Sequence, residues 1–289
     1  MTIIATAQSH VTSDIRVNGR EVRAAMEKAA AAGARLVHFP EAALSGYVKQ
    51  HVQDWADVDW RALREELEET AEEARHLGLW VVVGANHRLR SPHWPHNSLY
   101  VISDAGKVSG RYDKRLCSNT ELSFWYTPGT DPLVFKVDGV RFGCMTCIEV
   151  CFPHLFTEYG RLGVDCILLS SFSQDPIHGV MAQAHAATQC VWLSVSTPVC
   201  CSAGLPSMLF GPDGYPIASA RPGVPGLLLH RIDREAPAYR VALQHARPWR
   251  AKALSGEIYA PRRVQARSEA LPEAVLIPPS DAAAPAATR

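Results

Sequence analysis

Apolar and polar residues follow strand and helix periods in turn along the first third of the chain. Apolar, β-rich runs at 2–7, 35–39 and 79–85 predict three strands. Over 60–77 the apolar residues recur every three or four positions within a strongly charged stretch, which predicts an amphipathic surface helix. This alternation favours a sheet with helices packed on its face.

Another helix is predicted between the first two strands. Asn18 with Glu21 three residues later forms an Asn variant of the capping box, which predicts the start of that helix. Val22 and Met26 then recur at helical spacing, and Gly33 is a natural C-terminal stop.

From residue 97 the pattern changes to hairpins. Strand-like runs at 97–112 flank a turn at 104–106, and those at 132–147 flank the Asp138–Gly139 pair, which is typical of a two-residue turn. The other elements predicted in this part are a helix after Pro153, a strand at 164–171, a helix around 179–190, a strand at 191–196, a third hairpin at 207–219 and a last core strand at 226–232.

The sequence shows no repeat period and no internal break in composition, so we predict one α+β domain over residues 1–262. Its strands are expected to form one mixed sheet or two packed sheets, flanked by helices. Residues 263–289 are rich in Ala and Pro and are predicted to form a partly disordered tail.

Composition and charge exclude several classes of protein. The chain has 289 residues, 47% of them hydrophobic, which excludes disorder of the whole chain. Lys plus Arg and Asp plus Glu both number 29, and the net charge of +0 argues against nucleic-acid binding through a basic surface. No apolar run in the sequence approaches the ~20 residues that a membrane span needs.

The eight cysteines help to predict the cellular compartment in which the protein resides. Several of them lie inside apolar, strand-like runs, so we expect buried thiols rather than disulfides. The first residues, MTIIATAQSHVTSD, lack the basic segment and following apolar segment of a secretion signal. These features together predict a reducing, cytoplasmic location.

Three reactive side chains directly follow predicted strands: Glu41, Lys114 and Cys147. A sheet holds its strand ends rigidly while the loops after them admit ligands, so these positions favour catalytic groups. A carboxylate can take a thiol proton, a thiolate can attack carbon, and an ammonium can stabilise the negative charge that develops. Taken singly, each residue is more often structural, the Glu and Lys on the surface and the Cys in the core.

The segments around these residues resemble the nitrilase superfamily of carbon–nitrogen hydrolases, in the family's order. The resemblance covers residues 3–232, and the segments that carry it are 36–47 (LVHFPEAALSGY), 97–116, 139–156 (GVRFGCMTCIEVCFPHLF) and 207–214. It implies an α-β-β-α sandwich and a homodimer paired through helical faces. The catalytic residues that it implies are the base Glu41, the lysine Lys114, a second glutamate Glu121 and the nucleophile Cys147.

Two departures from the family pattern lie late in the chain. The helix that carries Arg-Ala-x-Glu-Asn in the family reads HAATQ at 185–189, and the Asn that commonly ends the next strand is Thr197. We expect the first change to alter helix packing or the subunit contact, and Thr197 to reshape the substrate pocket. The four implied catalytic residues are retained.

The cysteine and histidine spacings also allow other interpretations. Cys144 and Cys147 form a C-x-x-C pair, but their odd spacing along a strand directs the side chains to opposite faces. The sequence has no second C-x-x-C pair to complete a zinc site. His87, His93 and His96 span two prolines and are expected to form an exposed loop. We therefore expect no metal and no cofactor.

These features predict a thiol hydrolase that cleaves a non-peptide carbon–nitrogen bond through a thioester, with the backbone N–H of Ile148 helping to hold the oxyanion. True nitrilases of the family typically carry Cys-Trp-Glu, whereas this chain has Cys-Ile-Glu. An amide is therefore the first expected substrate, an N-carbamoyl compound the second and a nitrile the third. Phe124, Trp125 and Thr197 are expected to line the pocket. Acyl transfer to an amine and a non-catalytic binding role stay open as alternatives, although the retained residues argue against the second.

Overall fold

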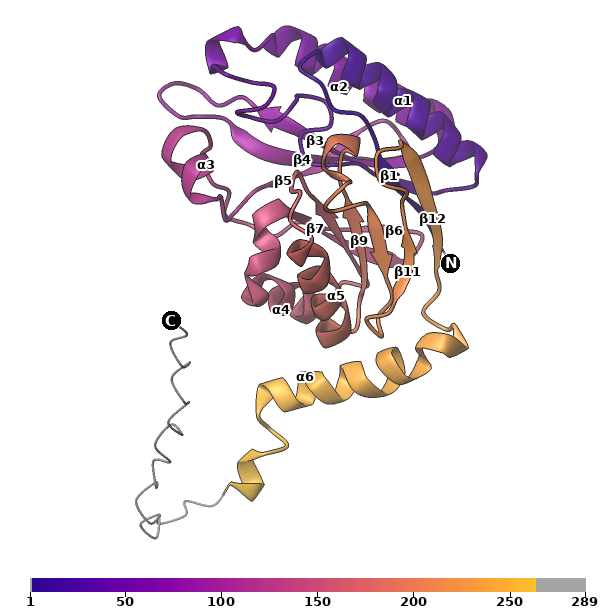
Figure 1. The fold of residues 1–289 in the computed structure, drawn as a ribbon. Coiled ribbons are helices and arrows are strands. Elements are labelled where there is room, and N and C mark those ends of the chain that lie inside the picture. Colours follow the sequence, from indigo (N-terminus) through magenta and orange to yellow (C-terminus); the bar gives the residue numbers. More distant parts are fainter. Residues whose placement is uncertain (1, 264–289) are drawn as a thin grey trace, which may run out of the picture. The chain divides into compact units, whose positions relative to one another are not determined.

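The computed structural model describes residues 2–263 of the chain, and its strands form two sheets of six (Figure 1). In spatial order, the first sheet contains β12 (Gly226–Ile232), β1 (Thr2–Gln8), β2 (Leu36–His38), β3 (Trp80–His87), β4 (His96–Ile102) and β5 (Val108–Asp113). The second contains β11 (Pro216–Ser219), β10 (Met208–Phe210), β9 (Trp192–Ser196), β8 (Cys166–Ser170), β7 (Val140–Thr146) and β6 (Val134–Val137).

Both sheets are mixed. Strands β1, β2 and β3 run parallel in the first sheet, as do β7, β8 and β9 in the second, and the remaining neighbours pair antiparallel. The α-helices are α1 (Ile15–Ala31), α2 (Trp60–Leu77), α3 (Asn119–Phe124), α4 (Pro153–Arg161), α5 (Ile177–Gln189) and α6 (Arg247–Ser255). Short helical turns are η1 (Trp55–Asp57), η2 (Cys147–Cys151), η3 (Val199–Cys201), η4 (Pro237–Tyr239), η5 (Val241–Ala246) and η6 (Ala260–Arg262).

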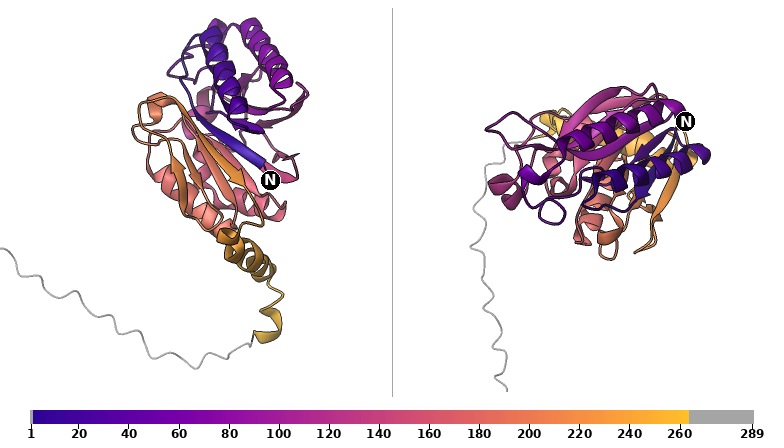
Figure 2. Two further views of the ribbon diagram at one scale, coloured as in Figure 1. Left: turned by 90° about the vertical axis from the view of Figure 1, so that its right-hand side faces the viewer. Right: turned by 90° about the horizontal axis from the view of Figure 1, so that it is seen from above.

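Apolar layers hold the helices and sheets together. Figure 2 shows α1 and α2 side by side over the first sheet, and Met26 of α1 and Leu63 of α2 pack in one cluster with Val81 and Val83 of β3. Val82, between those two valines, faces the other way, into the layer between the sheets. That layer includes Ile4, Leu36, Val82, Leu99, Cys144, Leu168 and Trp192.

The second sheet is covered in the same way. Leu155 and Phe156 of α4 and Ala182 of α5 pack against Ile167 of β8 and Val195 of β9. Helices therefore cover the outer face of each sheet, and the predicted α-β-β-α sandwich is confirmed.

One polar network crosses the layer between the sheets. His38 of β2 is fully buried, and its ring nitrogens lie 2.8 Å from Ser194 Oγ and 2.9 Å from Ser170 Oγ. Burial lowers the pKa of His38 to about 3, so the ring is neutral. Ser170 Oγ also donates to the carbonyl of Phe39 at 2.8 Å. The ends of β2 and β8, from which the loops with Glu41 and Phe172 leave, are thereby tied together.

The predicted capping box of α1 is wrong. The helix begins one turn earlier, and Asp14 is its N-cap, accepting from the backbone N–H groups of Arg16 and Val17 at 2.8 and 3.0 Å. Asn18 is instead buried inside the helix, where its side chain bonds the backbone of Thr12. A tertiary contact therefore uses the side chain that the local pattern assigned to capping.

Two further differences concern elements after residue 113. The strand β12 exists as predicted, but it is an edge strand with half-exposed residues and not a core strand. The pattern did not predict α3, which has six residues, or α6, which has nine.

The described chain divides into a compact unit that ends at Ala251 and a second unit that begins at Lys252. The tail predicted over 263–289 lies, beyond Arg263, outside the described residues. Among the helices of residues 2–263, none combines the length and the apolar character needed to cross a membrane.

Candidate active site

Glu41 lies on a loop that packs tightly against β3. The N–H of Leu44 donates to the carbonyl of Gly84 at 2.9 Å. A Cβ on Gly84 would stand 2.4 Å from the nitrogen of Ala42 and 2.5 Å from the carbonyl oxygen of Pro40. Only glycine permits this approach, which fixes the backbone of Glu41 to the sheet.

Lys114 joins two carboxylates in the interior. Its backbone N–H donates to the carbonyl of Asn97 at 2.8 Å, which continues the β4–β5 hairpin. Its Nζ donates to Glu41 Oε1 at 3.0 Å and to Glu121 Oε1 at 2.9 Å. All three side chains are buried, so their charges must be compensated within this cluster.

Glu121 is held in place from several sides. It is the N3 residue of α3, and a capping box with Ser118 positions it, with Ser118 N–H donating to Oε2 at 2.8 Å. The hydroxyl of Tyr47 donates to Oε1 at 3.0 Å. The carboxylate is thus well suited to serve as a fixed counter-ion for Lys114.

Cys147 occupies the sharp turn between β7 and η2. Its φ is +50°, a left-handed conformation that costs on the order of 1–3 kcal/mol in a residue with a Cβ. The backbone N–H of Phe172 lies near the Cys147 sulfur and acts to lower the pKa of the thiol. Ile148 follows in the first turn of η2, where backbone N–H groups have no intrahelical acceptor. The turn therefore offers a thiol and an N–H donor next to each other.

Glu149 ties this turn to the segment after Lys114. Its Oε1 accepts from the N–H groups of Arg115 and Leu116 at 2.8 and 3.1 Å, and its Oε2 accepts from the N–H of Thr146 at 2.7 Å. The carboxylate is buried. It fixes the turn that carries Cys147 relative to the segment after Lys114.

The environments of the two cluster carboxylates differ. Burial raises the pKa of Glu41, the negative charge of Glu121 adds to this, and Lys114 opposes it. Burial also acts to raise the pKa of Glu121, but the charge of Lys114 and the hydrogen bonds from Lys114 and Ser118 outweigh it and hold that pKa below its usual value. Glu41 Oε2 is buried without a hydrogen-bond partner. Glu121 is therefore suited to pair with the ammonium and Glu41 to accept a proton.

The thiol of Cys147 is protonated at rest. Burial, followed by the charge of Glu41, raises its pKa to about 12, although Lys114 and the N–H of Phe172 act in the opposite direction. A reaction at this sulfur must therefore pass the proton to a base during the attack.

A pocket of about 380 Å³ opens beside these residues. Its Tyr47 wall contacts the cluster, because the Tyr47 hydroxyl donates to Glu121. The backbone of Phe172, in another wall, lies near Cys147. The Tyr47 and Phe172 rings stack with centroids 4.5 Å apart. The residues that line this Tyr47–Phe172 pocket are Tyr47, Val48, Lys49, Gln50, Phe172, Gln174 and Cys201.

The residues expected to line the pocket lie elsewhere. Phe124 is 65% exposed, and Trp125 packs edge-on against Trp55 with ring centroids 5.7 Å apart. Thr197 is buried, and its hydroxyl donates to the carbonyl of Leu205 at 2.8 Å. None of the three lines the Tyr47–Phe172 pocket, and their contact with a substrate stays a prediction.

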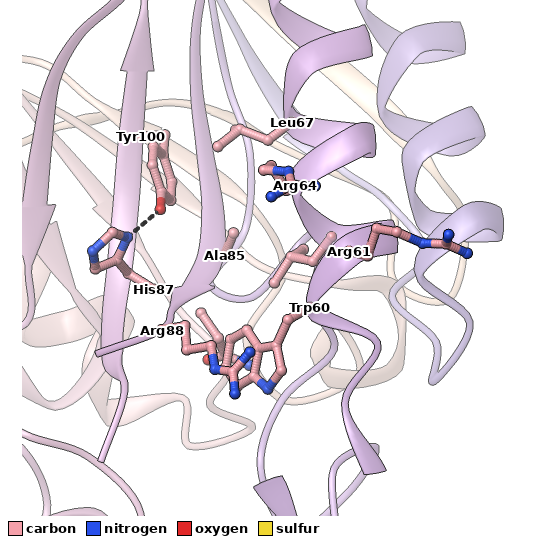
Figure 3. Close-up of a pocket in the computed structure, with 10 residues that line it drawn as sticks. Trp60, Arg61, Arg64, Leu67, Ala85, His87, Arg88 and Tyr100 are labelled. Carbon is pink, nitrogen blue, oxygen red and sulfur yellow. Dashed lines mark hydrogen bonds between the residues drawn. The ribbon is translucent and has the colours of Figure 1, made fainter. Parts of the chain in front are cut away.

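A second pocket, of about 400 Å³, lies between α2 and the first sheet (Figure 3). Trp60 and Arg64 of α2 face His87 and Tyr100 of the strands across it, and the His87 ring lies 2.6 Å from the Tyr100 hydroxyl. Its lining includes neither Cys147 nor the residues bonded to it, so it is separate from the candidate active site.

Sequence reasoning missed four residues of the site. Tyr47, Asn97 and Glu149 lie inside the segments that carried the resemblance but had no role there. The register of the first hairpin, extended by one pair, places Asn97 beside Lys114, and this signal could have identified it. Phe172 had no such signal, because its contact with Cys147 depends on the pairing of β7 with β8.

The cysteines are free thiols. Cys144 lies in the apolar layer between the sheets, in keeping with the expected core thiol. Among residues 2–263 no three or more side chains of His, Cys, Asp or Glu gather in an arrangement that could hold a metal ion.

Cys200 is an exposed thiol next to a buried one, and it should react first. Its sulfur lies 4.0 Å from that of Cys201, whose hydrogen bond lowers the pKa of Cys200 to about 7. Because the thiolate is the reactive form, we expect an aromatic disulfide reagent to modify Cys200 faster than Cys147 at neutral pH. Release of the coloured thiolate, with peptide mapping, measures this. A fast phase that persists in Cys200→Ser would contradict the assignment.

Comparison with known proteins identifies relatives among hydrolases. The chain is similar to a hydrolase of Mycobacterium tuberculosis, with 30% identity over 174 residues that cover 57% of this chain and 59% of that protein. The chain thus spans about three fifths of the length of this curated relative. It is also similar to the deaminated glutathione amidase of Homo sapiens, with 26% identity over 281 residues that cover 85% of this chain and 82% of that protein.

Among solved structures, an amidase from Nesterenkonia sp. AN1 matches with a TM-score of 0.73 and 22% identity, over 88% of this chain and 100% of that chain. At this level of identity the likeness shows a shared fold. The sequence model of the carbon-nitrogen hydrolase family matches residues 3–239, which is most of the chain. The resemblance to this family is thereby confirmed, and the chain belongs to the carbon–nitrogen hydrolases.

Proposed function

We propose that the protein hydrolyses the carbon–nitrogen bond of an amide, with Cys147 as the nucleophile. The observation that carries this proposal is the buried Glu41–Lys114–Glu121 cluster beside the Cys147 thiol, in which one Glu41 oxygen is unpartnered. Two relatives are named as amidases, and structures of the Nesterenkonia amidase show acrylamide added to its active site cysteine and butyramide bound. These names support the choice of an amide.

In the acylation step, Glu41 accepts the Cys147 proton as the sulfur bonds to the amide carbon. The π electrons of the carbonyl move to its oxygen, which becomes an oxyanion. Lys114 and the N–H of Ile148 stabilise that charge in a buried environment, where such interactions are stronger than in water. The proton held by Glu41 then passes to the leaving nitrogen, the carbon–nitrogen bond breaks, and a thioester remains.

In the deacylation step, Glu41 takes a proton from a water molecule as that water attacks the thioester carbon. The tetrahedral intermediate collapses with loss of the Cys147 sulfur, which regains the proton from Glu41. The products are a carboxylic acid and ammonia or an amine. Glu121 keeps Lys114 charged and aimed at the oxyanion throughout.

Amides should be better substrates than nitriles. The nucleophile segment reads Cys-Ile-Glu and lacks the Trp that nitrilases of the family typically carry. We expect kcat/KM for an amide to exceed that for the nitrile with the same side chain, measured by ammonia release and by the acid formed. A clear preference for the nitrile would overturn the amide assignment and leave the Glu41–Lys114–Cys147 chemistry standing.

The homodimer paired through helical faces stays a prediction. Ile177 and Val180 of α5 are 45% and 59% exposed, and such a pairing would cover apolar residues of this kind.

A further inference from the structure

The Tyr47–Phe172 pocket has a single charged side chain in its lining. Lys49 is exposed at the pocket, and the other lining residues are neutral, with Gln50 and Gln174 contributing amide groups. No acidic residue belongs to this lining. The wall formed by Lys49 is therefore suited to attract an anionic group.

The catalytic cluster differs from the Lys49 wall, because acidic groups outnumber basic groups in it. It holds two carboxylates, Glu41 and Glu121, against the single ammonium of Lys114. An anionic group placed beside the reacting carbon would meet unfavourable charge there and would compete for Lys114. A substrate with an anionic substituent must therefore carry it at a distance from the scissile bond, and the pocket wall is where such a group can be neutralised.

The backbone of Lys49 is held in an unusual conformation. Its φ is +67°, a left-handed value that disfavours a residue with a Cβ. Its N–H donates to the carbonyl of Val52 at 2.9 Å, and its carbonyl accepts from Gln53 Nε2 at 2.9 Å. Val48 and Val52 form a β-bridge across the same loop. A local conformation that is costly but well supported is common at ligand-binding positions, and here it fixes the point from which the ammonium extends.

From these observations we infer that the substrate is an amide that carries a carboxylate at its far end, and that Lys49 binds this carboxylate. The inference rests on the proposed amide hydrolysis and adds the substrate class. It makes Lys49 a specificity residue, which contacts the substrate away from the reacting atoms and takes no part in the proton transfers.

The test compares two amides that differ in one group. Succinamate and butyramide have the same length, and a carboxylate in the first replaces a methyl group in the second. We expect wild-type protein to prefer succinamate in kcat/KM by roughly 10- to 100-fold, the range that a charge-assisted hydrogen bond provides. Lys49→Met should lose this preference, so that its kcat/KM for succinamate falls to about the level of its kcat/KM for butyramide. Lys49→Arg should retain the preference, and Lys49→Glu should reverse it.

Lys136→Met is the matched control, because Lys136 is an exposed lysine on β6 that does not line the pocket. It should behave as the wild type does. Equal kcat/KM for both amides in the wild type, or a preference for succinamate that survives in Lys49→Met, would overturn the role of Lys49 and leave amide hydrolysis intact. Failure to release ammonia from either amide would overturn the proposed function together with this inference.

Discussion

Replacement of Cys147 by Ala is expected to lower turnover by on the order of 10⁴-fold or more, as loss of a nucleophile does in other enzymes. The variant keeps the Cβ at the strained φ of +50° and removes only the sulfur, so the turn between β7 and η2 should persist. Cys144 cannot replace it, because that thiol lies in the layer between the sheets. The measurement is kcat for the best amide, together with a thermal unfolding curve for the fold.

Cys144→Ala is the matched control for this experiment. It also removes a buried thiol, and we expect it to lower stability through the cavity that it leaves, with turnover largely retained. Mass spectrometry of wild-type protein mixed with substrate should show an acyl group on the peptide that contains Cys147. Comparable turnover in Cys147→Ala and the wild type, or an acyl group on a different residue, would exclude Cys147 as the nucleophile.

Glu41→Gln is expected to slow acylation by roughly 10²–10⁴-fold, the usual contribution of a general base. The change is nearly isosteric, and Oε1 can still accept from Asn97 and Lys114 as the amide oxygen. It also leaves one carboxylate, Glu121, against one ammonium, so the buried cluster stays compensated and the protein should fold. Single-turnover kinetics of thioester formation measure the effect directly.

The pH dependence of kcat/KM should distinguish the role of Glu41 from that of Glu121. Burial raises the pKa of Glu41 above its ordinary value, so the ionised base is lost as the pH falls through that raised pKa. The acid limb of kcat/KM should therefore lie above the pH at which an ordinary carboxyl group titrates. Glu41→Gln should lose this limb, whereas Glu121→Gln should be slower but keep it. The reverse result would assign the base to Glu121.

Some elements of this protein depend on local sequence alone, and those predictions agree with the structure. Asp138 and Gly139 both have positive φ, as the two-residue turn requires. Gly78 ends α2 in a left-handed conformation, after a stripe of apolar residues that packs on the first sheet. Turn residues and apolar periods act within a few positions, so they can be interpreted without knowledge of the rest of the chain.

The order of the strands and the geometry of the site depend on contacts that are distant in sequence. Glu41 and Lys114 are 73 residues apart, and they meet because β2 and β5 lie in one sheet with β3 and β4 between them. The family resemblance indicated which residues belong together, but periodicity and spacing could not. The approach of the Phe172 backbone to Cys147 arises in the same way, from the parallel pairing of β7 with β8.

Local periods and ordered motifs were thus enough to predict most of the elements, the fold class and the family, although they missed α3 and α6. The use of each polar side chain depends on contacts that form only in the folded chain. The Asn18 side chain, predicted to cap a helix, is buried and donates to the carbonyl of Thr12. The Thr197 hydroxyl donates to the carbonyl of Leu205. The fold also places Lys49 on the wall of the pocket. A buried polar group must form a hydrogen bond with a partner that the fold brings near it, and the whole fold decides which groups become buried.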